Sequence, residues 1–195
     1  MHNGANVLRQ NIFGCTGSPV ISVLEVFILI ANPLPVGYHF LTMKVAIGSD
    51  HAGFQLKQKV LAWLREKACE VQDVGTHSEV RCDYPDFAKI VAEKVSRGEV
   101  ERGILVCGSG IGMSIAANKV VGVRAAECVD AHTAEMSRAH NDANVLCLGG
   151  RLIGEDVARK MVEIWLSTPF EGGRHAVRIE KIREIELQYL KGTPV

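Results

Sequence analysis

The sequence lacks an excess of charge, because 22 lysines and arginines balance 22 aspartates and glutamates over 195 residues. No overall field therefore draws the protein to nucleic acid or to an acidic membrane, and we expect neither as a partner. An anion must instead be bound by local geometry. Hydrophobic residues make up 47% of the chain and charged residues 23%. These proportions exclude a wholly disordered protein and suit one α/β domain, with or without an appendage.

Disulfide and metal motifs are absent as well. The six cysteines include no C-x-x-C pair in a chain that is neither short nor cysteine-rich, which favours free thiols in a reducing, cytoplasmic compartment. The seven histidines form no H-x₃-H pair, and none stands at zinc-ligand spacing from a cysteine. We therefore expect no metal and no organic cofactor.

Residues 1–42 have little charge, since Arg9 and Glu25 are their only arginine, lysine, aspartate or glutamate residues. Their apolar run at residues 20–31 is shorter than the about 20 residues that cross a bilayer. A weak targeting segment, an interfacial peptide and a stretch upstream of a true start at Met43 are three open interpretations. We favour the third, because a strand pattern begins directly after Met43. We predict an N-terminal extension outside the fold at residues 1–42 and a working domain at residues 43–195.

From Met43 onward, short β-branched runs alternate with helical patterns. Leu56, Val60 and Leu64, for example, recur at the spacing of one helix face. We predict strands at residues 44–47, 70–74, 104–106, 123–128 and 144–148, with helices between them and two after the last. This order predicts an α/β fold: a Rossmann-like three-layer sandwich around a five-stranded parallel sheet. Ligands in such folds bind beyond the carboxyl ends of the strands.

The third predicted strand ends at Cys107 and leads through a glycine-rich loop into a helix. Gly108, Gly110 and Gly112 let backbone N–H groups converge on an anion beside a helix N-terminus. A thiolate is favoured before such a loop, which makes Cys107 a candidate base or nucleophile. A small buried side chain followed by a tight turn is the alternative. The spacing matches neither the dinucleotide fingerprint nor the Walker A loop.

Asp50 and His51 directly follow the first predicted strand. A carboxylate and an imidazole at a strand's carboxyl end can position hydroxyl groups and contact a phosphate. The alternative is that Asp50 caps the next helix and His51 is a surface residue.

Further candidates lie toward the C-terminus. His140 could transfer protons and Asn141 could donate a hydrogen bond to developing oxygen charge, although a loop histidine often has no such role. Arg174 and Arg178 share one face near a helix N-terminus, where cations oppose the helix dipole. A phosphate between them would explain this arrangement, and a solvated charged face is the alternative. Arg151 is a third candidate phosphate contact.

Together these residues suit proton abstraction from a small phosphorylated metabolite without metal or cofactor. Residues 43 to about 190 resemble the B-type ribose-5-phosphate isomerases of the ribose/galactose isomerase superfamily. The resemblance is carried, in the family's order and spacing, by residues 48–54, 83–85, 107–119, 140–145 and 172–175. Residues 1–42 have no counterpart in that family.

The resemblance implies interconversion of ribose 5-phosphate and ribulose 5-phosphate in the pentose phosphate pathway, by a homodimer or tetramer whose active sites combine both subunits. It implies that Cys107 moves the proton between C2 and C1 and that His140 assists opening of the furanose ring. The resemblance further implies that the loop from Gly108 to Gly112, together with Ser109 and Asn141, stabilises the enediolate. It implies that Asp50 positions the sugar hydroxyls. The phosphate would be bound by His51, Arg151, Arg174 and Arg178.

Two other functions stay open at this point. An isomerase of the same mechanism could act on a six-carbon sugar phosphate, such as allose or galactose 6-phosphate, because chain-length discrimination depends on pocket depth. The related galactose 6-phosphate enzymes divide their motifs between two kinds of subunit, whereas this chain has the whole set, which favours the ribose substrate. A non-catalytic sugar-phosphate-binding module would be expected to lack some of the thiol, histidine and arginine set, and all of them are present.

Overall fold

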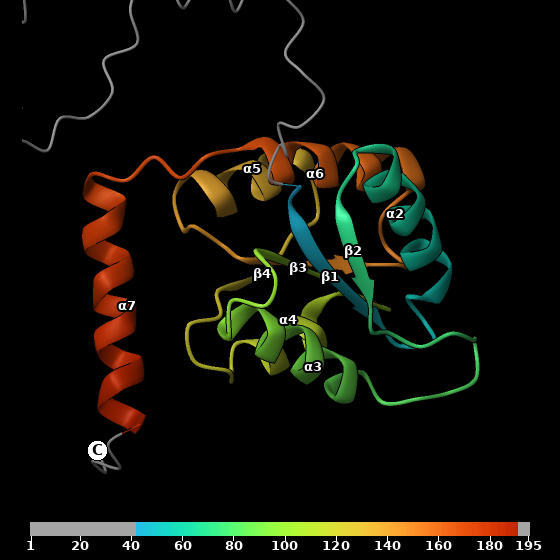
Figure 1. Cartoon of the computed structure of the whole chain (residues 1–195), viewed down its shortest axis with the longest axis horizontal. Helices are drawn as coiled ribbons and strands as arrows, with labels where there is room; N and C mark the ends of the chain where they lie inside the picture. Colours follow the sequence, from blue (N-terminus) through green and yellow to red (C-terminus); the bar gives the residue numbers. More distant parts are fainter. Residues whose placement is uncertain (1–41, 191–195) are drawn as a thin grey trace, which may run out of the picture. The chain divides into compact units, whose positions relative to one another are not determined.

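A five-stranded parallel sheet lies at the centre of the fold, in a computed structural model that describes residues 42–190 (Figure 1). Its strands, in the order β2-β1-β3-β5-β4, are β1 (Lys44–Ser49), β2 (Glu70–Asp73), β3 (Arg102–Cys107), β4 (Ala125–Glu127) and β5 (Val145–Gly149). All four pairings are parallel. The prediction of an α/β fold around five parallel strands is confirmed. The predicted N-terminal extension lies outside the described residues, apart from Thr42.

Helices cover both faces of the sheet, so the three-layer arrangement is confirmed as well (Figure 1). One face packs against α2 (Phe54–Glu66), α5 (Ala131–Ala139) and α6 (Glu155–Ser167), and the other against α3 (Tyr84–Ser96) and α4 (Ile111–Ala117). Successive residues of a strand point to opposite faces. In β1, Val45 and Ile47 accordingly belong to the first apolar core, whereas Ala46 belongs to the second. Helices therefore cover both faces, which leaves the ends of the strands available for a ligand.

Local sequence signals account for the helices. The predicted stripe of Leu56, Val60 and Leu64 in α2 is buried against the sheet. Pro85 occupies the first turn of α3, where its missing N–H costs no hydrogen bond. In α5, the side chain of Asp130 accepts the N–H of Thr133 at 2.7 Å and completes a capping box.

The fourth strand is shorter than predicted, because side chains replace ladder partners at its start. The N–H of Arg124 donates to Oδ1 of Asn144 at 2.8 Å instead of joining a strand ladder. Residues 123 and 124 therefore precede the strand, and β4 spans only Ala125–Glu127.

The last helix, α7 (Arg174–Leu190), stands beside the edge of the sheet that ends in β4 (Figure 1). Only its residue His175 is buried, whereas Ile185 and Tyr189 are 55% and 58% exposed. These two side chains and Ile182 line one wall of a groove of about 450 Å³ whose other wall is formed mainly by residues around β4. The helix thus presents an apolar face that its own chain leaves largely uncovered. Within residues 42–190, no helix is both long and apolar enough to cross a membrane.

Candidate active site

Cys107 lies at the carboxyl end of β3, opposite Gly149 at the end of β5. Its side chain is buried, and the backbone N–H of Gly110 donates a hydrogen bond to its sulfur at 3.1 Å. This bond fixes the direction of the sulfur, because the loop after the strand turns back over it. The thiol is therefore held in one orientation at the end of the sheet where parallel α/β folds bind ligands.

The loop after Cys107 depends on glycine at two positions. Gly110 has φ of +84°, which side-chain-bearing residues rarely adopt, and a Cβ there would lie 3.0 Å from Cγ of Glu127. A Cβ on Gly112 would lie 2.7 Å from the ring of Tyr84. The glycines thus permit a turn that neighbouring elements pack against closely.

Two backbone donors of this loop have no protein partner. Among the described residues, the N–H groups of Gly108 and Ser109 donate to no acceptor. Both residues are half-buried, so the donors lie next to Cys107 at the surface of the site. Free N–H groups beside a thiol can stabilise negative charge that develops on a substrate oxygen.

Asp50 and His51 reach the same end of the sheet from β1. Asp50 is buried, its N–H donates to the carbonyl of Val106 at 3.3 Å, and its Oδ1 accepts the N–H of Gly53 at 3.0 Å. The N-cap of α2 is Gly53, so the alternative in which Asp50 caps this helix is wrong. Nδ1 of His51 lies 3.3 Å from the N–H nitrogen of Cys82. The same Nδ1 lies 3.2 Å from the carbonyl oxygen of Cys82, so it has a partner in the backbone of Cys82 in either tautomer of the ring.

Arg151 belongs to this group as well, because the turn after β5 is bonded to the loop after β3. The N–H of Gly150 donates to the carbonyl of Cys107 at 2.7 Å, and the N–H of Arg151 donates to that of Gly108 at 3.1 Å. A Cβ on Gly108 would lie 3.7 Å from Cδ of Arg151. The arginine side chain is exposed. Its cation is therefore held next to the free N–H groups and can bind an anion there.

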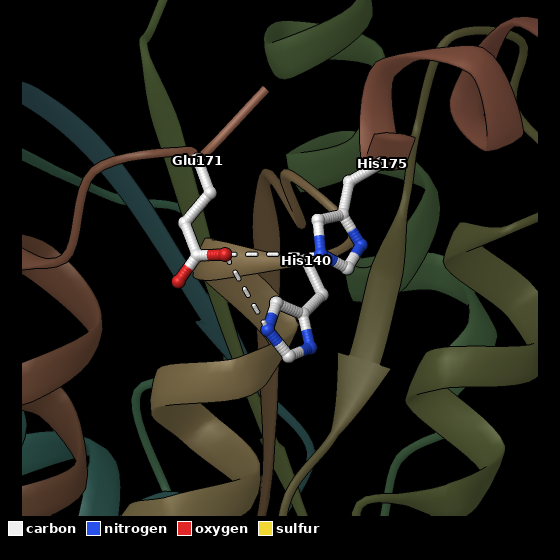
Figure 2. A group of neighbouring side chains, drawn as sticks. All are labelled: His140, Glu171 and His175. Atoms are coloured by element: carbon white, nitrogen blue, oxygen red, sulfur yellow. Dashed lines mark ion pairs between the residues drawn. The ribbon is translucent and has the colours of Figure 1, made fainter. Parts of the chain in front are cut away.

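His140 belongs to a second group of side chains (Figure 2). Nε2 of His140 lies 3.6 Å and Nε2 of His175 lies 3.7 Å from the same oxygen, Oε2 of Glu171. The two imidazoles are stacked, with centroids 4.2 Å apart and planes inclined by 4°. His140 ends α5, Glu171 lies in the loop after α6, and His175 lies in the first turn of α7, so three elements meet here.

The remaining predicted residues surround this second group. Asn141, Arg174 and Arg178 are exposed, and Nε of Arg174 donates to Nε2 of His175 at 3.3 Å. The turn after His140 is fixed by Asp142, which has φ of 45° and whose carboxylate accepts hydrogen bonds from Arg124 at 2.8 Å and Arg138 at 2.7 Å.

The two groups lie at opposite ends of the sheet. Cys107 ends β3, whereas the segment that follows His140 reaches the start of β3, where the carbonyl of Asn144 accepts the N–H of Gly103 at 2.9 Å. Cys107 lies four positions after Gly103 in this strand, which is roughly 13 Å at a rise of about 3.3 Å per residue. The structure therefore brings Asp50, His51, Cys107, Gly108 and Arg151 together with Ser109, Gly110 and Gly112, but places His140, Asn141, Arg174 and Arg178 elsewhere.

Sequence reasoning missed Glu171 and gave His175 no role. No sequence signal pointed to the pair, because Glu171 lies in the loop before α7 and its i, i+4 spacing from His175 is therefore not the spacing of a helix face. Two histidines and a glutamate are also zinc-ligand types. However, Nε2 of His175 already accepts from Arg174, and the positive charge of Arg174 disfavours a second cation. The expectation of no metal stays a prediction.

The pKa of His175 is lowered, first because its ring is removed from solvent and then because His140, Arg174 and Arg178 lie nearby. Burial likewise raises the pKa of the Cys128 thiol to about 11, and it raises that of Cys147. Cys128 and Cys147 are buried core residues of the sheet region and are poorly suited to thiolate chemistry.

Comparison with known proteins identifies what these arrangements resemble. The family Ribose/Galactose Isomerase matches residues 45–182. Ribose-5-phosphate isomerase B of Escherichia coli is 50% identical over 143 residues, which cover 73% of this chain and 96% of that protein. The solved structure of ribose-5-phosphate isomerase B of Clostridium thermocellum is 54% identical in sequence, and the two structures match with a TM-score of 0.75. The match covers 75% of this chain and 99% of that chain. A D-erythrulose-4-phosphate isomerase of Pectobacterium atrosepticum is 42% identical over 147 residues, 75% of this chain and 97% of that protein.

Proposed function

The chain belongs to the ribose/galactose isomerase family, and from this premise we propose that it interconverts D-ribose 5-phosphate and D-ribulose 5-phosphate in the pentose phosphate pathway. The observation that carries the proposal is the buried, oriented thiol of Cys107 beside the free N–H groups of Gly108 and Ser109. An aldose–ketose isomerase needs a base at C2 and C1 and donors for the enediolate oxygens. This end of the sheet supplies both.

Cys107 acts as the base. Its thiolate removes the proton from C2 of the open-chain aldose, the C2–H electron pair forms the C1–C2 double bond of the enediolate, and the π pair of the C1 carbonyl moves to O1. The thiol then returns the proton to C1 while the hydroxyl proton moves from O2 to O1, which leaves a ketone at C2. A positioned base contributes about 10²–10⁴-fold to the rate.

The loop stabilises the intermediate. The N–H groups of Gly108 and Ser109, the Ser109 hydroxyl and the Asn141 amide donate to the enediolate oxygens, and the turn through Gly110 and Gly112 holds these donors in place. Donors that are fixed before the reaction starts supply about 3 kcal/mol each in comparable sites.

The remaining residues bind the substrate. The Asp50 carboxylate positions the sugar hydroxyls. The phosphate is held by His51, Arg151, Arg174 and Arg178. Among the described residues these three arginines take part in no ion pair, so their positive charges are available to a dianion. Binding the phosphate away from the reacting carbons orients the sugar.

A second copy of the chain completes the site, because His140, Asn141, Arg174 and Arg178 lie at the opposite end of the sheet from Cys107. The apolar face of α7 supports this assembly, and so does α4, on which Ile111 and Ile115 are 53% and 58% exposed next to the catalytic loop. We propose a homodimer, or a tetramer built from such dimers, that acts in the cytoplasm on a small sugar phosphate without nucleic acid, membrane or cofactor.

Substrate length is the point on which a second candidate function has support. The relative named D-erythrulose-4-phosphate isomerase has a similar degree of identity over a similar span, so the same machinery serves other phosphosugars. Comparing kcat/KM for four-, five- and six-carbon sugar phosphates ranks the substrates. If kcat/KM is highest for a six-carbon sugar phosphate, such as allose 6-phosphate, then that compound and not ribose 5-phosphate is the substrate.

The test of the proposed function is an isomerase assay on ribose 5-phosphate in the presence of EDTA, with solvent deuterium exchange at C1 of ribulose 5-phosphate measured in parallel. We expect both activities in the wild type, and a loss of about 10²–10⁴-fold in Cys107→Ala. Cys69→Ala at the amino end of β2 is the matched control and should behave like the wild type. The absence of both turnover and exchange in the wild type would refute the proposed function. Full activity in Cys107→Ala would refute the assignment of Cys107 as the base.

A further inference from the structure

We infer that Glu171 is a positioning residue that orients the imidazole of His140 for opening of the sugar ring, with His175 as the surface against which that imidazole is stacked. The inference rests on the proposed function, in which His140 assists ring opening. It adds two residues that act through His140 and not directly on the reacting carbon.

Glu171 lies to one side of the stacked pair, with its carboxylate facing a nitrogen of each ring (Figure 2). One oxygen, Oε2, lies 3.6 Å from Nε2 of His140 and 3.7 Å from Nε2 of His175. The Glu171 side chain is 56% exposed, whereas that of His175 is 6% exposed. The carboxylate can therefore approach His140 from the solvent side as substrate binds, while His175 stays in place. Catalytic hydrogen bonds are often longer in the free enzyme and shorten in the substrate complex.

Only one of the two rings can give Glu171 a hydrogen bond from Nε2. Nε2 of His175 accepts the N–H of Arg174, so a neutral His175 carries its proton on Nδ1. Among residues 42–190, no donor competes in this way at Nε2 of His140. A proton on Nε2 of His140 faces the Glu171 carboxylate, and this leaves Nδ1 as the atom that exchanges a proton with the sugar.

His175 fixes the plane of the His140 ring without adding charge to it. The two planes differ by 4° at a centroid distance of 4.2 Å, so His175 covers one face of the His140 ring. The charged groups that surround the pair are Glu171 from the loop after α6, Arg174 and Arg178 from α7, and Asp142 beyond His140, whose carboxylate is occupied by Arg124 and Arg138. Removal from solvent, followed by the proximity of His140, Arg174 and Arg178, lowers the pKa of His175 and so favours the neutral form of its ring.

Ring opening is a step that only one direction of the reaction needs. In the furanose form of ribose 5-phosphate, the C1–O4 bond breaks, its electron pair goes to O4, and O4 takes up a proton. The O1 hydroxyl loses its proton, and C1 becomes the aldehyde carbon. Ribulose 5-phosphate has no such ring to open, because its O5 is esterified with phosphate. Residues that serve ring opening are therefore separable from Cys107, which serves both directions.

The experiment compares the wild type with Glu171→Gln and Glu171→Leu. Turnover of ribose 5-phosphate should fall roughly 10- to 100-fold, below the full contribution of a general acid–base group, and the fall should appear in kcat more than in KM. Deuterium exchange at C1 of ribulose 5-phosphate should stay within about 2-fold of the wild type, because the open-chain ketose bypasses the step. Nitrogen-15 NMR should show the proton of neutral His140 on Nε2 in the wild type and lose that preference in Glu171→Leu.

Glu180→Gln is the matched control, since Glu180 is exposed on the same helix as His175 and pairs with Arg183. It should leave both activities unchanged. If Glu171→Gln and Glu171→Leu behave like this control, or if they reduce exchange and turnover equally, the inference is wrong. Loss of the proposed function itself gives a different pattern, because the wild type would then show neither turnover nor exchange.

Discussion

Cys107 and His140 lie at opposite ends of one sheet, although both belong to the set of motifs that predicts one active site. Cys107 ends β3 beside Gly149, whereas His140 ends α5 before the segment that leads to the start of β5. A base and a ring-opening group that lie a strand's length apart cannot act on one five-carbon sugar within one chain. On the proposed function, each chain would therefore carry one half of two different sites, and the pairing of two copies would create both sites.

Subunit complementation follows from this division. Cys107→Ala and His140→Asn are each expected to be nearly inactive, yet a mixture of the two, unfolded and refolded together, should recover activity. In a mixed dimer one site carries both substitutions and the other is intact, so random pairing restores about a quarter of wild-type turnover. No recovery after verified mixed-dimer formation would show that both residues act in the same chain.

Replacing Gly110 in the loop after Cys107 by alanine should reduce activity more than the same replacement at another glycine with positive φ. Gly110→Ala and Gly98→Ala both place alanine at positive φ, at +84° and +69°, which costs about 1–2 kcal/mol of unfolding free energy in each. Among the described residues nothing lies within 4 Å of a Cβ at Gly98, whereas a Cβ at Gly110 meets Glu127 and the backbone of Leu148.

Urea unfolding and steady-state kinetics measure the two effects. Gly110→Ala should lose turnover by at least about tenfold because the donors of the loop move, while Gly98→Ala should keep it. Equal turnover in the two variants would contradict the close packing of the loop.

The stability of the protein should fall on mild acidification because of His175. Its pKa is lowered in the folded protein, so between the unfolded value of about 6.5 and the lower folded value the unfolded chain binds more protons. The free energy of unfolding is therefore highest above about pH 6.5 and decreases as the pH falls through this range. His175→Gln should have a shallower dependence, measured by urea unfolding at constant protein concentration. A slope that this substitution leaves unchanged would contradict the assignment.

The positions of the strands along the chain and the layers were largely predictable, because they depend on short-range patterns. The buried runs of β1, β3 and β5 and the stripe of α2 encode which face each residue covers. The start of β4 was not predictable, since the carbonyl oxygen of the Asn144 side chain replaces a ladder partner from 20 residues away. Such a substitution of partners depends on tertiary contact and leaves no periodic signal.

The site was predictable in its components and only partly in its arrangement. Strand-end placement identified Asp50, Cys107 and the turn with Arg151, because the carboxyl ends of parallel strands meet at one edge. The same reasoning gave no place for His140, which comes before a strand and not after one. Glu171 was missed because a single carboxylate in a loop has no distinctive spacing until His140 and His175 are brought beside it.

The backbone bonds from Gly150 and Arg151 to the carbonyls of Cys107 and Gly108 join two loops into one rigid unit. On the proposed assignment, this unit spans the thiol that works on the first two carbons and a guanidinium that holds the phosphate at the far end of the sugar. The protein would then select substrates by length, since a longer or shorter carbon chain must bend or stretch to bridge a distance that the backbone sets. Substitutions that relax these two bonds would be a direct route to an enzyme with a broader range of substrate lengths.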